Sequence, residues 1–133
     1  MVPIKRVDHV GVVVADLAQA KRLLGETFGL PLVREQEATD GGLSAAFYRC
    51  GEVEIEVMEP RRPEDRAAWL GDERWGRIEH IAVEVEDLEA TITALRELGI
   101  GAEPVAQGLL GISIRTEPAA TLGVVFQLLQ KAR

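Results

Sequence analysis

The 133-residue sequence contains a single cysteine, and aromatic residues make up only 5% of it. Because Cys50 has no cysteine partner in the chain, no intrachain disulfide can form, which is typical of a reducing compartment. We expect Cys50 to be a small buried apolar residue rather than a nucleophile, since nothing indicates an electropositive site around it. The sequence therefore excludes a fold held together by disulfides.

Long hydrophobic runs are also absent. The longest apolar run, Val10–Ala15, is far shorter than the roughly 20 residues that a membrane-spanning helix needs. The N-terminal residues show no apolar segment of the kind found in secretory signal peptides. We expect a cytoplasmic protein that does not enter a membrane.

Positive charge is scarce, because 15 Lys and Arg residues face 22 Asp and Glu residues, giving a net charge of −7. Such a chain repels phosphate groups, which argues against a nucleic-acid partner and against an anionic membrane surface. Hydrophobic residues make up 47% of the sequence and support a core, so that we expect one compact domain.

An internal repeat divides the sequence. Residues 7–17 read VDHVGVVVADL and residues 78–88 read IEHIAVEVEDL, at an offset of 71 residues. The only two histidines of the chain, His9 and His80, fall on the same position of this repeat. Two copies of one folding unit are therefore expected.

Each copy continues with a helical pattern. Asp16 and Asp87 precede apolar residues at helical spacing and are expected to be N-caps, and Gln19 would complete a capping box with Asp16. Gly29 and Gly99 stand where a helix end favours a left-handed residue. Each copy thus begins with a strand followed by a helix.

The rest of each copy has the character of strands. We predict strands over 43–49 and 53–58 in the first copy, and over 112–116 and 123–129 in the second. Pro63 opens a short linker helix through Leu70, which Trp69 would dock. The predicted fold is α+β, with two tandem βαβββ modules at 1–60 and 78–133 joined by the linker 61–77.

Four polar positions share the face of the strands that points away from the helices. Side chains alternate along a strand, so His9 lies opposite the valines that face the core, next to the small residue Gly11. His9 to Glu56 spans 47 residues, and so does His80 to Gln127. Two imidazoles, a carboxylate and an amide oxygen suit Zn, Fe, Ni, Co or Mn.

Simpler interpretations remain open for these residues. A strand histidine is often an ordinary core or surface residue, and the glutamates at 52, 54 and 56 form one face that water alone could solvate. Glu54 is an alternative ligand to Glu56, although its repeat partner is the apolar Val125.

These motifs give the chain a family resemblance. The opening VDHVGVVVADL, the strand VEIEVMEP, the repeat GRIEHIAVEVEDL and the closing GVVFQLLQ resemble the vicinal oxygen chelate superfamily. That superfamily includes glyoxalase I, extradiol dioxygenases, bleomycin-resistance proteins and methylmalonyl-CoA epimerases, and the chain looks most similar to the epimerases.

The resemblance implies curled mixed sheets around a metal cleft, together with a ligand set, a cofactor and an assembly. His9, Glu56, His80 and Gln127 match the four positions that hold a divalent metal ion, and a homodimer is implied. Gln127 departs from the pattern, because epimerases and glyoxalases carry glutamate there. Ala45 falls near a further acidic residue of some epimerases. Neither an amide nor a methyl group can act as a base.

The leading hypothesis is therefore a metal-dependent epimerase or isomerase that moves a proton next to a carbonyl, with Glu56 as the catalytic base. The substrate would be a small carbonyl compound, such as an acyl-CoA, whose phosphates Arg61, Arg62, Arg66 or Arg77 would meet unless these are ordinary solvated side chains. An Fe(II) dioxygenase, a glyoxalase-type lyase and a non-catalytic binding or resistance protein are the alternatives.

Overall fold

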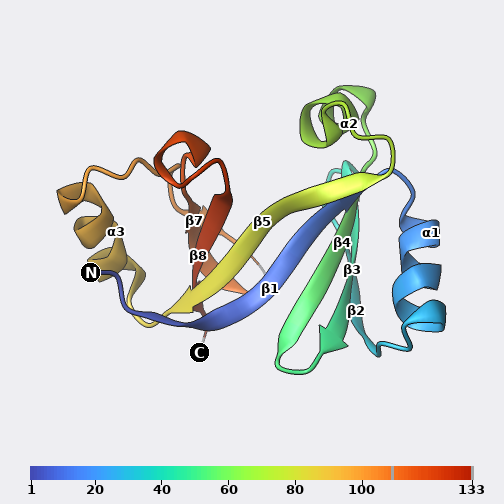
Figure 1. The fold of residues 1–133 in the computed structure, drawn as a ribbon, viewed down its shortest axis with the longest axis horizontal. Helices are drawn as coiled ribbons and strands as arrows, with labels where there is room; N and C mark the ends of the chain where they lie inside the picture. The colour runs from blue at the N-terminus through green and yellow to red at the C-terminus, as the bar shows by residue number, and fades with distance from the viewer. Residues whose placement is uncertain (109, 133) are drawn as a thin grey trace. The chain divides into compact units, whose positions relative to one another are not determined.

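The structure is a computed structural model that describes residues 1–108 and 110–132. Its strands and helices follow one another in the order of Figure 1. They are β1 (Ile4–Val14), α1 (Leu17–Lys21) with a π-helical continuation over Arg22–Thr27, β2 (Leu32–Glu37), β3 (Leu43–Cys50), β4 (Val53–Pro60), α2 (Pro63–Leu70), β5 (Gly76–Val85), α3 (Leu88–Glu97), β6 (Ala106–Gln107), β7 (Gly111–Arg115), a 3₁₀ turn (Pro118–Ala120) and β8 (Val125–Lys131).

The chain divides into two units. The N-half unit comprises residues 9–79, and the C-half unit comprises residues 1–8 together with 80–133. Strand β1 passes from one unit to the other between Asp8 and His9, and strand β5 does so between Glu79 and His80. Both histidines thus stand where a continuous strand enters a new unit.

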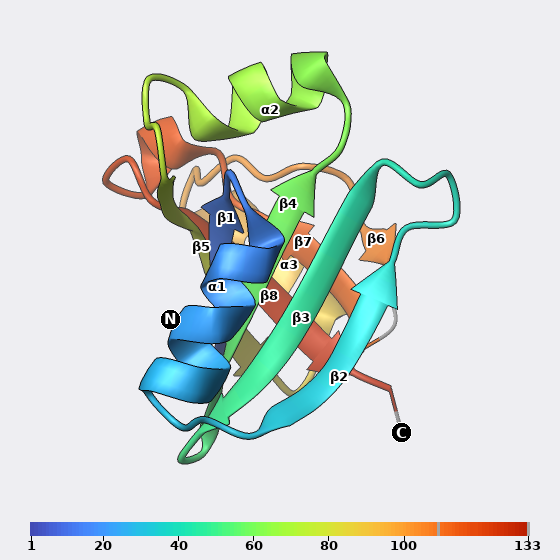
Figure 2. The same cartoon turned by 90° about the vertical axis from the view of Figure 1, so that its right-hand side faces the viewer.

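In the N-half unit, strands β2, β3, β4 and β1 lie side by side in that order. Strand β1 runs parallel to β4, while β3 runs antiparallel to both β2 and β4. Helix α1 covers one face of this sheet (Figure 2). The core between helix and sheet contains Val14, Leu24, Ala46, Tyr48 and Val57, so the apolar part of this face packs against the helix.

The C-half unit repeats the pattern, with β5, β8, β7 and β6 in that order, β5 parallel to β8 and the other pairs antiparallel. Leu88 and Leu95 of α3 pack with Val83, Ile114 and Leu128. The expected α+β class with two tandem βαβββ modules is confirmed. The pair of parallel strands in each unit places the histidine strand directly beside the strand that carries Glu56 or Gln127.

The helix ends follow the predicted chemistry. Asp16 Oδ1 accepts a hydrogen bond from Gln19 N at 3.1 Å, and Asp87 Oδ1 accepts one from Ala90 N at 3.1 Å. Gly29 and Gly99 take φ angles of 69° and 72° just beyond the helices, where a residue without Cβ avoids a steric penalty. Both expected N-caps and both expected glycine C-caps are confirmed.

Replacing Asp87 with alanine should lower the free energy of unfolding by about 1 kcal/mol, because the N-cap oxygen satisfies a backbone N–H that is otherwise unpaired. Chemical denaturation of wild type and variant measures this difference. Asp72→Ala, at an exposed carboxylate in the turn after α2, is the matched control and should change stability much less. Equal stabilities of the Asp87 and Asp72 variants would contradict the capping role.

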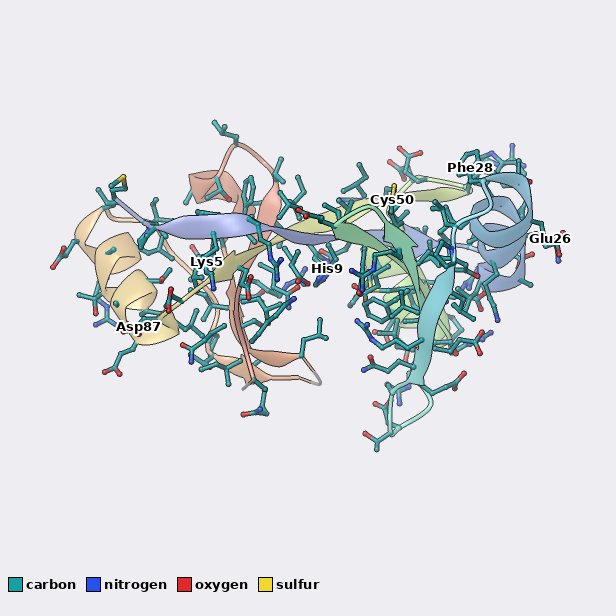
Figure 3. All side chains as sticks on the ribbon, turned by 90° about the horizontal axis from the view of Figure 1, so that it is seen from below. Lys5, His9, Glu26, Phe28, Cys50 and Asp87 are labelled. Atoms are coloured by element: carbon teal, nitrogen blue, oxygen red, sulfur yellow. The ribbon has the colours of Figure 1, made fainter. Side chains whose placement is uncertain are left out.

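Two predictions differ from the structure. Cys50, expected to be buried, is exposed at the end of β3 (Figure 3), because it is the last paired residue of the strand and stands beside the exposed turn at Gly51. Strand β8 begins at Val125 instead of Gly123, since Leu122 and Gly123 have φ angles of 62° and 80° and a left-handed backbone cannot continue a strand. Among the described residues, no helix has the length and apolar character to cross a membrane.

Candidate metal centre

In the N-half unit, His9 and Glu56 lie on the sheet face opposite α1. The register pairs His9 with Glu54, and Gly11 with Glu56, so these side chains share one face. His9 is 3% exposed, and its Nε2 lies 3.6 Å from Glu56 Oε1. Gly11 has no side chain to fill the space beside the imidazole. The structure thus brings together the two predicted ligands of this unit.

The His9 ring also contacts Phe47 of β3. The two ring centroids are 6.2 Å apart with the planes at 77°, an edge-to-face arrangement that is favourable for aromatic pairs. Phe47 is buried and stands opposite Glu56 in the register. An aromatic wall therefore holds the imidazole in place and lowers the polarity around the carboxylate.

Glu54, the alternative ligand, is engaged elsewhere. One carboxylate oxygen lies 3.1 Å from Arg34 Nη1 and the other lies 3.0 Å from Arg49 Nη2. Two guanidinium groups thus occupy both oxygens, whereas the Glu56 carboxylate is directed at His9. This arrangement favours Glu56 over Glu54 as the ligand.

In the C-half unit, His80 and Gln127 occupy the equivalent positions. His80 is 4% exposed, and Ala82, the residue in the place of Gly11, is fully buried. The register pairs Ala82 with Gln127, as it pairs Gly11 with Glu56. The repeat seen in the sequence is thus a repeat of geometry within each unit.

The amide of Gln127 is oriented by Ser113. Its Nε2 donates a hydrogen bond to Ser113 Oγ at 3.1 Å, while its Oε1 is buried and has no hydrogen-bond partner among the described residues. An unpaired buried carbonyl oxygen costs about 1–3 kcal/mol, and a cation would satisfy it. The imidazole and amide oxygen of this unit, like the imidazole and carboxylate of the N-half unit, are donors that suit a borderline divalent metal.

In the N-half unit, Ala45 lies on the same face of β3 as Phe47 and is paired with Met58 of β4. It is buried in an apolar cluster with Phe47 and Met58, against which Trp69 of α2 packs. The surroundings of position 45 are therefore apolar. Trp69 docks α2 as predicted.

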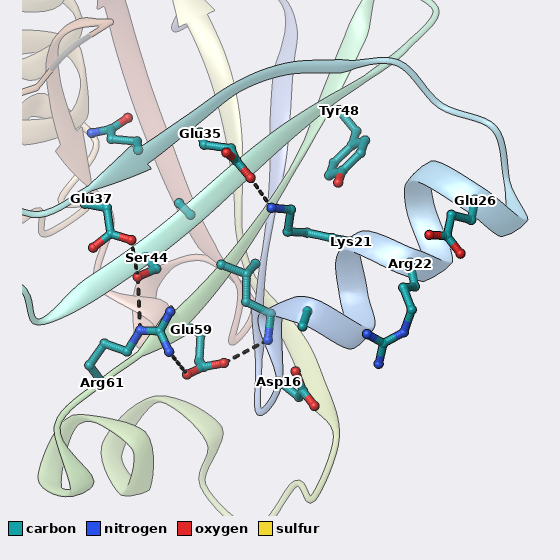
Figure 4. A pocket seen from close by; sticks show the side chains of 14 residues that line it. Asp16, Lys21, Arg22, Glu26, Glu35, Glu37, Ser44, Tyr48, Glu59 and Arg61 are labelled. Atoms are coloured by element: carbon teal, nitrogen blue, oxygen red, sulfur yellow. Dashed lines mark hydrogen bonds and ion pairs between the residues drawn. The ribbon is translucent and has the colours of Figure 1, made fainter.

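A separate hollow of about 800 Å³ lies on the α1 side of the N-half sheet (Figure 4). Its charged groups pair with one another, since Lys21 bonds Glu35 and Ser44 Oγ bonds both Glu37 and Arg61. The hydrogen bond to Glu35 raises the pKa of the Lys21 ammonium above its usual value. This hollow is on the face opposite His9 and is not the candidate centre.

Several arginines considered for phosphate binding are held by the protein itself. Arg61 Nη1 lies 2.7 Å from Glu59 Oε2, Arg62 Nη2 lies 3.1 Å from Asp40 Oδ2, and Arg66 Nη2 donates to the carbonyl oxygen of Ala15 at 2.9 Å. These contacts agree with a structural or solvated role for the arginines.

Arg34 was not singled out from the sequence. Its guanidinium lies over the Phe47 ring, with Cζ 3.8 Å from the centroid. The pairing of Arg34 with Phe47 follows a β-bulge between Leu32 and Arg34. A bulge of this kind leaves no clear signal in one sequence, because it changes which face a residue occupies.

Comparison with known proteins supports the resemblance seen in the motifs. A family model described as the Glyoxalase/Bleomycin resistance protein/Dioxygenase superfamily matches residues 8–114. The chain is 32% identical over 97 residues to the ethylmalonyl-CoA/methylmalonyl-CoA epimerase of Cereibacter sphaeroides, and the match covers 72% of each protein.

Solved structures give the same picture. The methylmalonyl-CoA epimerase of Mycobacterium tuberculosis superposes with a TM-score of 0.87 at 28% identity, covering 100% of this chain and 92% of that chain. A variant of the Streptomyces coelicolor methylmalonyl-CoA epimerase, in complex with 2-nitronate-propionyl-CoA, shares the fold with a TM-score of 0.85 at 24% identity, covering 98% of this chain and 96% of that chain.

Proposed function

The chain belongs to the Glyoxalase/Bleomycin resistance protein/Dioxygenase superfamily, which is the vicinal oxygen chelate superfamily that its sequence motifs resemble. On this basis we propose that it is a metal-dependent isomerase. It moves a proton at the carbon next to the carbonyl of an acyl-CoA. The observation that carries the proposal is the pair of the buried His9 and the partly buried Glu56, 3.6 Å apart on the face of the N-half sheet opposite α1. The named activities of the epimerase relatives support the acyl-CoA substrate.

Four side chains would hold the metal in this proposal. His9 and His80 offer imidazole nitrogens, Glu56 offers a carboxylate oxygen, and Gln127 adds the amide oxygen that Ser113 leaves unpaired. A bound divalent ion supplies positive charge that polarises the substrate carbonyl and makes its α-proton more acidic. With one carboxylate among four ligands, the ligand set carries one negative charge.

Glu56 is the base of the proposed reaction. Its carboxylate takes the α-proton, the C–H electron pair moves into the carbonyl to give an enolate, and the proton then returns to carbon. Neither the Gln127 amide nor the Ala45 methyl group accepts a proton. A single base serves one face of the enolate, so exchange of the α-proton should be faster than inversion of the carbon.

Proton exchange at C2 of methylmalonyl-CoA in D₂O tests this function. NMR should show deuterium incorporation by the metal-loaded protein, and incorporation should stop after chelation and resume when Co²⁺, Ni²⁺, Zn²⁺ or Mn²⁺ is restored. Chiral analysis of the same samples should show slower inversion than exchange. Absence of exchange with every metal, on this and on other acyl-CoA substrates, would refute the proposal.

Gln127→Glu should raise the rate of inversion relative to exchange, because it places a second carboxylate at the position equivalent to Glu56. The ratio of the two rates for wild type and variant is the measurement. Gln130→Glu, three residues away on β8, is the control. An unchanged ratio in the Gln127 variant would show that the missing carboxylate does not limit inversion.

The proposed ligands are also compatible with a second function. Two histidines and one carboxylate form the ligand triad of non-haem Fe(II) oxygenases. Oxygen consumption by the Fe(II)-loaded protein with catechols would favour that reaction, and proton exchange without oxygen consumption favours the isomerase.

We further propose a homodimer, for which sedimentation at two protein concentrations is the test.

A further inference from the structure

Arg34 lies on the same face of the N-half sheet as the proposed centre. The register places Arg34 opposite Phe47 and Phe47 opposite Glu56, so one row across β2, β3 and β4 carries all three side chains. The Arg34 side chain extends over β3, because its Nη1 reaches Glu54 on β4 at 3.1 Å. The guanidinium therefore lies above Phe47 and not at the outer edge of the sheet.

The position of the guanidinium relative to His9 follows from the shared aromatic ring. Arg34 Cζ is 3.8 Å from the centroid of Phe47, and the His9 ring is 6.2 Å from the same centroid. The cation is thus within about 10 Å of the imidazole, which is about two strand spacings. A metal–imidazole bond of about 2 Å and a guanidinium–carboxylate hydrogen bond of about 3 Å take up half of this distance, and an acyl group of a few carbons spans the rest.

One edge of the guanidinium has no hydrogen-bond partner in the described part of the chain. Nη1 bonds Glu54, but Nε and Nη2 are buried and make no hydrogen bond to any residue that the structure describes. These two nitrogens form the side of the guanidinium that binds a carboxylate through two parallel hydrogen bonds. Stacking on Phe47 restricts the orientation of the guanidinium plane.

The ion pairs that Arg34 itself makes leave a positive charge that favours an anion. Glu54 is shared between Arg34 and Arg49, so these three side chains carry one net positive charge. Glu54 orients the Arg34 fork and does not neutralise both arginines. The Arg34 side chain is 23% exposed, and this partial burial strengthens its attraction for an anion over that of a fully solvated arginine.

We propose that Arg34 binds a carboxylate of the substrate and thereby selects acyl groups that carry a free carboxylate. This inference rests on the proposed function, which identifies the face with His9 and Glu56 as the substrate site. The substrate carboxylate accepts hydrogen bonds from Nε and Nη2, and Phe47 packs beneath the ion pair. Arg34 is thus a specificity-determining residue and takes no part in the proton transfer.

Binding of malonate and propionate tests this inference without turnover. The two probes differ by one carboxylate, and the full chain is titrated both metal-loaded and after chelation and dialysis. Wild type should bind malonate at least tenfold more tightly than propionate in both states, and the ¹⁵N-detected Nε–H signal of Arg34 should move downfield. If the preference for malonate over propionate persists after the metal is removed, the second carboxylate is bound by Arg34 and not by the metal ion.

Variants provide the decisive comparison. Arg34→Gln should abolish the preference for malonate, and Arg34→Lys should restore only part of it because a lysine has no fork. Arg49→Gln removes the other partner of Glu54 and should keep the preference. An Arg34→Gln protein that still prefers malonate tenfold, or a wild-type Nε–H signal that malonate leaves unmoved, would overturn the inference. A failure of proton exchange would instead refute the isomerase proposal alone.

Discussion

Substitution of His9 by alanine is expected to weaken divalent metal binding by more than about a hundredfold, because loss of a supporting contact alone costs 10- to 100-fold and His9 would be a direct ligand. The imidazole is 3% exposed and lies 3.6 Å from the Glu56 carboxylate. Loss of the imidazole leaves the partly buried Glu56 carboxylate with one ligand fewer beside it to hold a metal ion. His80→Ala should have a similar effect.

Elemental analysis of protein purified without a histidine tag measures this effect, followed by titration with a competing chelator. His9→Asn keeps a polar side chain of smaller reach and should also lose metal, while circular dichroism confirms that the sheet is intact. Lys5→Ala on the same strand, at an exposed position, is the control. Full metal content in both histidine variants would show that the imidazoles are not ligands.

The second large effect concerns Glu56. Glu56→Gln should reduce the rate of α-proton exchange by about 100- to 10,000-fold, the usual contribution of a positioned base. The amide keeps an oxygen that can contact a metal ion but has no basic lone pair for a proton at neutral pH. The rate of deuterium incorporation at saturating methylmalonyl-CoA, in protein loaded to equal metal content, is the measurement.

Equal metal loading is the essential control for Glu56, because a loss of metal alone would also slow exchange. Glu52→Gln, in the exposed turn before β4, removes a carboxylate of the same short segment and should leave the rate unchanged. If Glu56→Gln exchanged the proton as fast as wild type at equal loading, another group would be the base.

The parts of the fold that repeat in sequence were predictable. The offset of 71 residues identified both histidine strands, and the N-cap aspartates and C-cap glycines located both helices, because these features depend on local chemistry alone. The alternation of apolar side chains also separated the core face of β1, with Val14, from the face with His9. The positions of Glu56 and Gln127 followed from the equal spacing of 47 residues.

Other features depend on tertiary contacts and were not predictable. Whether Glu54 or Glu56 faces His9 depends on the two arginines that occupy Glu54. Arg49 lies across the β3–β4 turn from it, but Arg34 comes from β2, and that contact cannot be read from the sequence. The role of Arg34 follows from a β-bulge that shifts the register by one residue. The exposure of Cys50 depends on where β3 ends, and strand ends are weakly specified by sequence.

The boundary between the two units at Asp8 and Glu79 has a consequence for the duplicated sequence. Residues 1–8 belong to the unit built from the second repeat, where Arg6 Nε lies 2.8 Å from Glu84 Oε2 and Lys131 Nζ lies 2.6 Å from Asp8 Oδ1. A gene cut between the repeats would therefore give two fragments, neither of which encodes a whole unit. Each fragment would carry a strand segment that belongs to the other, so fragment complementation, rather than independent folding of half-length ancestors, is the behaviour that this architecture favours.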